Sequence, residues 1–73
     1  MMTMEEYKKI ANKKRVKRAK AALLAYIEYS SLTEDDDNVV DLVTDLLHLI
    51  HNEGTDINKI IRIATTHFYS EKL

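Results

Sequence analysis

Cysteine, proline and tryptophan are absent from this 73-residue chain, and Gly54 is its only glycine. Without cysteine the chain has no disulfide, no thiolate metal site and no cysteine nucleophile. A β-sheet protein needs turn residues at about every 8 to 12 positions, and this chain lacks them. These absences predict an all-α fold.

Long apolar runs are also absent. No stretch approaches the roughly 20 apolar residues needed to cross a bilayer, and the N-terminus is charged from Glu5 onward, unlike a signal peptide. We therefore expect a soluble cytoplasmic protein with no membrane partner. The length predicts one helical domain over residues 1–73. A core of that size contributes only about 3–5 kcal/mol, so the chain is also a candidate homodimer.

Charge is plentiful but unevenly placed. The net charge is −1, yet residues 1–20 contain eight of the eleven basic residues and only two acidic ones, a local charge of +6. Residues 21–73 carry −7. The sequence thus divides into a basic N-terminal part and an acidic remainder.

Helical periodicity predicts three helices, over about residues 4–30, 36–53 and 56–71. Thr3 and Glu6 have capping-box spacing at the start of the first. The cap of the second is Thr33 with Asp36, or Asn38 with Asp41. Its apolar residues cover most of the circumference, which predicts the central, most buried helix.

Gly54 stands where the second helix would end in the left-handed conformation, and Thr55 or Asp56 follows as a cap for the third. A connection this short predicts an antiparallel hairpin. We expect a compact three-helix bundle, with an acidic hairpin over residues 36–71 as its core and the basic helix 4–30 packed across it.

A line of polar residues follows the second helix at positions i, i+3, i+4, i+7 and i+11, namely Asp41, Thr44, Asp45, His48 and Asn52. A tightly paired hairpin would bring His67 level with Asp41 or one turn from Asp45. The favoured interpretation is structural, with an imidazole and a carboxylate satisfying each other beside an apolar core.

A metal site built from Asp41, Asp45, His48 and His67 is the less favoured alternative, because the paired Glu-x-x-His motifs of carboxylate bundles are missing. Acid–base catalysis is weaker still, since three short helices offer little concave volume. We expect no enzyme activity and no cofactor.

The basic segment of the first helix contains Lys8, Lys9, Lys13, Lys14, Arg15, Lys17, Arg18 and Lys20. It is either a solvated face or a contact surface for phosphates or acidic protein groups. The cations surround the helix, which suits electrostatic contact better than base readout. A helix-turn-helix fails because the would-be recognition helix offers only Lys59 and Arg62.

The stretch from residue 41 to residue 68 resembles a pattern in small, largely uncharacterised proteins of bacteriophages and other mobile elements. The residues that carry it are Asp41-Leu42, Thr44-Asp45-Leu46, His48, Gly54, Asp56, Ala64 and His67-Phe68. The match covers 28 of 73 residues and consists mainly of helix-packing signals. The resemblance implies a mobile-element setting and favours a binding role over an enzyme.

We therefore expect a small interaction protein that modulates a host protein or nucleoprotein complex through its basic first helix. The alternative is a nucleic-acid-binding protein that uses the same cations. A metal-dependent activity at the Asp/His cluster ranks third.

Overall fold

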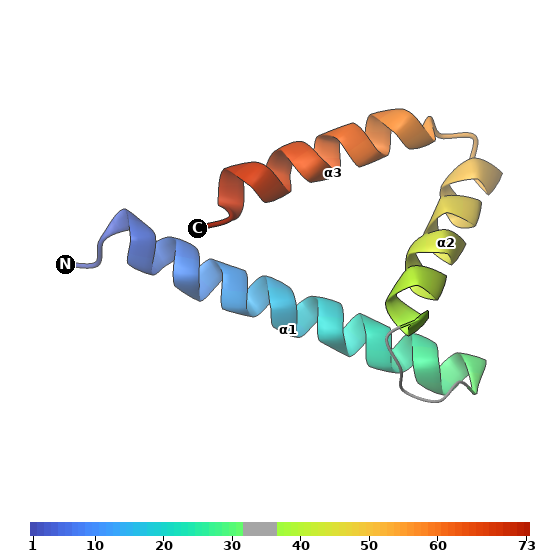
Figure 1. The fold of residues 1–73 in the computed structure, drawn as a ribbon, viewed down its shortest axis with the longest axis horizontal. Coiled ribbons are helices and arrows are strands. Elements are labelled where there is room, and N and C mark those ends of the chain that lie inside the picture. The colour runs from blue at the N-terminus through green and yellow to red at the C-terminus, as the bar shows by residue number, and fades with distance from the viewer. Residues whose placement is uncertain (32–36) are drawn as a thin grey trace.

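The computed structural model describes residues 1–31 and 37–73. These form three α-helices: α1 (Met4–Ser30), α2 (Asp37–Asn52) and α3 (Ile57–Glu71). Each bound lies within one residue of the expected one, and the all-α three-helix prediction is confirmed. Figure 1 shows the helices as the sides of an open triangle, in which α2 leaves the end of α1 and α3 returns towards its start.

Side-chain caps begin α1 and α3 as the sequence predicts. The Glu6 N–H donates to Thr3 Oγ1 over 3.1 Å at the start of α1. Asp56, rather than Thr55, caps α3, because its Oδ1 accepts the N–H groups of the second and third helical residues. These bonds satisfy N–H groups that have no partner inside their helix.

Only one of the two caps expected for α2 falls within the described residues. Thr33 and Asp36 lie outside the described residues. The alternative cap, Asn38, is wrong, because the helix already includes it.

The turn after α2 follows from its glycine. Gly54 has a φ of +74°, its N–H donates to the His51 carbonyl over 3.0 Å, and the Thr55 N–H donates to the Ile50 carbonyl over 3.2 Å. This pair of bonds is the Schellman arrangement that closes a helix with a left-handed residue. Ser31 ends α1 in the same conformation, with a φ of 56° and without the freedom of glycine.

The chain is more extended than the compact bundle we expected. Its radius of gyration is 14.9 Å, against about 11 Å for a compact domain of this length. Consecutive helices contact each other, but α2 and α3 meet at a corner instead of lying side by side (Figure 1). The turn that closes α2 and caps α3 redirects the chain, so the apolar faces do not meet along their length.

Burial is correspondingly sparse. Among the described residues only Ile27 and Asn38 are buried, at 8% and 2% exposure. The second helix, which was expected to be the most buried, is therefore largely exposed. Its apolar residues occupy about half of the circumference, and most of them are exposed.

Candidate functional site

Where α1 meets α2, one residue of the predicted polar line finds its partner. The Tyr26 hydroxyl of α1 donates to Asp45 Oδ2 of α2 over 2.7 Å. Ile27, the neighbour of Tyr26, is the buried apolar residue of the same helix. A charge-assisted hydrogen bond thus joins the two helices next to a buried apolar residue.

The titration of Tyr26 reflects that contact. The hydrogen bond to Asp45 raises the pKa of Tyr26 to about 12, with further increases from burial and from the negative charges of Asp45 and Asp41. A nearby Ser30 hydrogen bond opposes the shift. A tyrosine with this pKa stays protonated at neutral pH, so it serves as a hydrogen-bond donor and not as a base.

The other members of the polar line do not come together. Asp41, His48 and His67 are exposed, and Asp41 and His67 form no hydrogen bond or ion pair with each other in the described part of the chain. His67 belongs to the last turns of α3, which lie beside the first half of α1, whereas Asp41 lies near Tyr26. The expected pairing of His67 with Asp41 or Asp45 is wrong, because it required α2 and α3 to lie side by side.

The metal hypothesis has no geometric support. Over residues 1–31 and 37–73 no group of three or more His, Asp or Glu side chains is placed to hold a metal ion. Asp45, one of the four candidates, already accepts the Tyr26 hydroxyl.

The first half of α1 holds the end of α3 by polar contacts, which we call the clasp. Arg15 Nη2 lies 3.0 Å from Glu71 Oε2. The Asn12 side-chain amide donates to the Glu71 carbonyl over 2.9 Å, and Lys8 Nζ donates to the Ser70 carbonyl over 3.2 Å. Cations and donors near the C-terminal carbonyls of a helix are favourable, because those groups lack partners and the helix dipole is negative there.

Two of the eight predicted contact residues, Lys8 and Arg15, are therefore engaged within the chain. The other six form what we call the basic face: Lys9, Lys13, Lys14, Lys17, Arg18 and Lys20. At about 100° per residue these six occupy roughly half of the helix circumference, away from the clasp. None of them makes an ion pair in the part of the chain that the structure describes.

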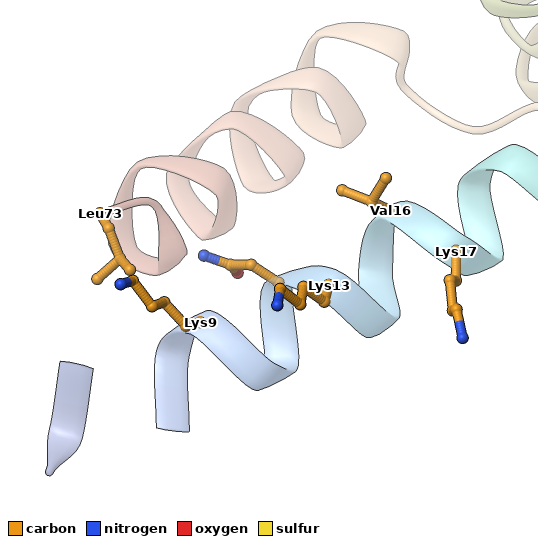
Figure 2. A pocket seen from close by; sticks show the side chains of 6 residues that line it. Lys9, Lys13, Val16, Lys17 and Leu73 are labelled. Carbon is orange, nitrogen blue, oxygen red and sulfur yellow. The ribbon is translucent and has the colours of Figure 1, made fainter. Parts of the chain in front are cut away.

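The start of the basic face borders a shallow groove. Lys9, Lys13 and Lys17 line it together with Asn12, Val16 and Leu73, and its volume is about 550 Å³. In Figure 2 the Val16 side chain points towards α3 and Lys17 points the other way. Lysine side chains thus border a small apolar patch.

Sequence reasoning missed Tyr26 and Asn12. Tyr26 falls in an apolar segment that is typical of core packing, although a partly buried tyrosine hydroxyl needs a partner. Lys8, Asn12 and Arg15 follow each other at i, i+4 and i+7, which places them on one helix face. That spacing marks a polar face, but it does not identify the end of α3 as the partner.

None of the described helices is long and apolar enough to cross a membrane. Comparisons with protein-family models, curated proteins and solved structures find no match to this chain.

Proposed function

We propose that this chain is a small non-enzymatic interaction protein that binds a host protein or nucleoprotein complex through the basic face of α1. The observation that carries the proposal is the division of the cations. Lys8 and Arg15 hold α3, while the six cations of the basic face make no ion pair within the described residues. The resemblance to mobile-element proteins supports a host component as the target.

The composition of the surface favours a protein partner. Protein interfaces combine an apolar centre with a polar rim, and Val16 and Leu73 lie among the lysines of the groove. Five of the six cations are lysines, which act as point charges and lack the planar fork that reads carboxylates or guanine edges in pairs. Attraction to an acidic protein patch needs no such geometry.

The charge of the rest of the chain points the same way. Residues 21–73 carry a net −7, which opposes close approach by a long polyanion. A folded partner with a local acidic patch can meet the basic face alone. Long-range attraction of this kind mainly accelerates association and weakens as salt rises.

Direct nucleic-acid binding is the second candidate, supported by the spread of the basic face around half of α1. A surface that broad can follow phosphates without reading bases. The two candidates differ in their dependence on nucleic acid.

The test compares two charge-matched variants. Lys13→Gln with Lys17→Gln removes two charges from the basic face, and Lys59→Gln with Arg62→Gln removes two from α3. Glutamine is nearly as good a helix former as lysine, so both variants should keep their helicity by circular dichroism. In affinity capture from host extract, we expect a partner that the wild type and the α3 variant retain and the basic-face variant loses.

Nuclease treatment separates the candidates. A protein partner stays bound after nuclease, whereas direct nucleic-acid binding appears as anisotropy changes with a labelled DNA duplex. In the second case the log–log salt slope should fall by about 0.9 for each phosphate that the variant no longer neutralises. A folded basic-face variant that keeps its partner at physiological salt contradicts both.

A further inference from the structure

Apolar side chains line the spaces between the three helices, and we call them together the apolar strip. Its members are Val16, Ala19 and Leu23 of α1, Val39, Leu42, Val43 and Leu46 of α2, and Phe68 and Leu73 at the end of the chain. The part between α1 and α2 is a groove of about 460 Å³. Val16 borders this groove and the two near the C-terminus, and it is 66% exposed.

The helices that form the strip are patterned for burial. The apolar side of α2 contains no charged residue from Val39 to Ile50, because Asp41, Asp45 and His48 lie on the opposite side. On α3, Ile60 and Ile61 share a face with Phe68, and all three are exposed. Over the described residues, both helices therefore carry an apolar face that is largely exposed.

The small thickness of the molecule explains why these apolar faces are exposed. Its extents are 44 × 30 × 17 Å, and a single helix with side chains is already about 10–12 Å wide. The triangle is therefore little more than one layer of helices (Figure 1). Stable domains bury their apolar faces between at least two layers.

The surface that this chain exposes in excess of a compact monomer matches the area that a homodimer buries. The chain exposes 6531 Å², whereas a folded monomer of 8.5 kDa exposes about 4,700 Å². The excess is about 1,800 Å² per chain, or about 3,700 Å² for two chains. Obligate homodimers bury about 2,000–5,000 Å².

We propose that a second copy of this chain covers the apolar strip, so that two triangles stack into a two-layer homodimer. A two-fold interface brings the same patch of both copies together, and here apolar meets apolar without a buried like-charge pair from α2. Lys20, at the rim of the groove, keeps its ammonium in water while its stem packs. Lys9, Lys13 and Lys17 border Val16 and Leu73 at the edge of the strip, whereas Lys14 and Arg18 lie farther round the helix. The basic face thus flanks the interface and is present twice per dimer.

The mass in solution is the first test. The full chain should sediment at twice the 8.5 kDa chain mass and lose helicity as dilution dissociates it. A wild type that stays monomeric and fully helical across a wide concentration range overturns the proposal. A monomer with a compact scattering radius overturns it equally, because α2 and α3 would then close over the strip themselves.

A matched pair of substitutions locates the interface. Leu46→Glu places a charge in the strip, where the side chain is 46% exposed, and Tyr29→Glu makes the same change at a site that is 90% exposed and faces away from Ile27. We expect Leu46→Glu to weaken self-association by more than about tenfold, since a buried unpaired charge is costly. Tyr29→Glu should leave the dimer intact, and equal effects of the two would overturn the proposal.

A labelling experiment covers the outcome in which Leu46→Glu fails to fold. The chain has no cysteine, so Val43→Cys and Tyr29→Cys each create a single reactive thiol. Maleimide should label Val43→Cys more slowly than Tyr29→Cys, by about tenfold or more in the dimer, and the difference should vanish on dilution. Equal rates at high concentration overturn the proposal. None of these readouts uses the basic face, so the dimer and the proposed function can fail independently.

Discussion

Helix α1 meets its two neighbours by different chemistry. Its second half is joined to α2 by the hydrogen bond from Tyr26 to Asp45, next to the buried Ile27. Its first half holds α3 through the clasp, whose ion pair joins Arg15 and Glu71 with side chains 40% and 33% exposed. Apolar burial resists salt, whereas an exposed ion pair is screened by it. The position of α3 should therefore depend on ionic strength more than that of α2.

The largest expected effect on stability comes from a substitution at Ile27, the buried apolar residue of α1. Ile27→Ala should lower the free energy of unfolding by about 2–3 kcal/mol, the lower part of the range for such truncations, because few neighbours surround the site. Leu24→Ala on the same helix, where the side chain is 43% exposed, is the control and should lose less than about 1 kcal/mol. Urea unfolding at fixed protein concentration measures both. Equal losses would mean that this corner is not the core.

The second-largest effect on stability is expected at Gly54, in the turn after α2. Gly54→Ala should cost about 1–2 kcal/mol, because alanine disfavours the left-handed conformation. An added Cβ meets nothing within 4 Å, so the loss is conformational and not steric. Ser31→Gly is the converse experiment at the end of α1 and should stabilise the chain by up to about 1 kcal/mol. Thermal unfolding of the two variants should shift in opposite directions.

The hydrogen bond from Tyr26 to Asp45 should make the stability of the protein depend on pH in the alkaline range. The folded protein holds the Tyr26 proton more tightly than the unfolded chain, since the pKa rises from 10.0 to about 12. The resulting stability is fully present below about pH 10 and is lost as the pH rises through about 12. Tyr26→Phe should remove this part of the pH dependence, as measured by urea midpoints across the alkaline range. An ultraviolet titration that shows all tyrosines ionising near 10 contradicts the contact.

The clasp should contribute less to the free energy of unfolding than Ile27 or Gly54. A double-mutant cycle of Arg15→Gln and Glu71→Gln should give a coupling of about 0.2–1 kcal/mol at low salt, the range for exposed ion pairs. The coupling should shrink at high salt, while the loss caused by Ile27→Ala should not. A coupling that ignores salt would contradict the contrast between the two corners.

The smallest expected coupling tests the corrected geometry. Asp41→Ala and His67→Ala should be additive within about 0.3–0.5 kcal/mol, because the two residues lie in different parts of the triangle. Strong non-additivity would restore the side-by-side hairpin.

Local features were predictable from the sequence because their causes lie within a few residues. The Thr3 and Asp56 caps, the left-handed Gly54 and all three helix ranges depend on hydrogen bonds between near neighbours. The pairing of His67 with Asp41 was wrong because it rested on an assumed angle between two helices. Apolar periodicity shows which face of a helix is buried but leaves open what covers it.

By itself the sequence determined the three helices, their ends and the separation of basic from acidic charge. The tertiary structure alone decided that Tyr26 is the partner of Asp45 and that Lys8 and Arg15 hold α3, which leaves the basic face to the other six cations. The physical reason is how far apart in the sequence the interacting residues lie. A helix is set by bonds that span four positions, whereas the contacts of α1 with α2 and with α3 join residues 19 to 62 positions apart, which no local pattern specifies.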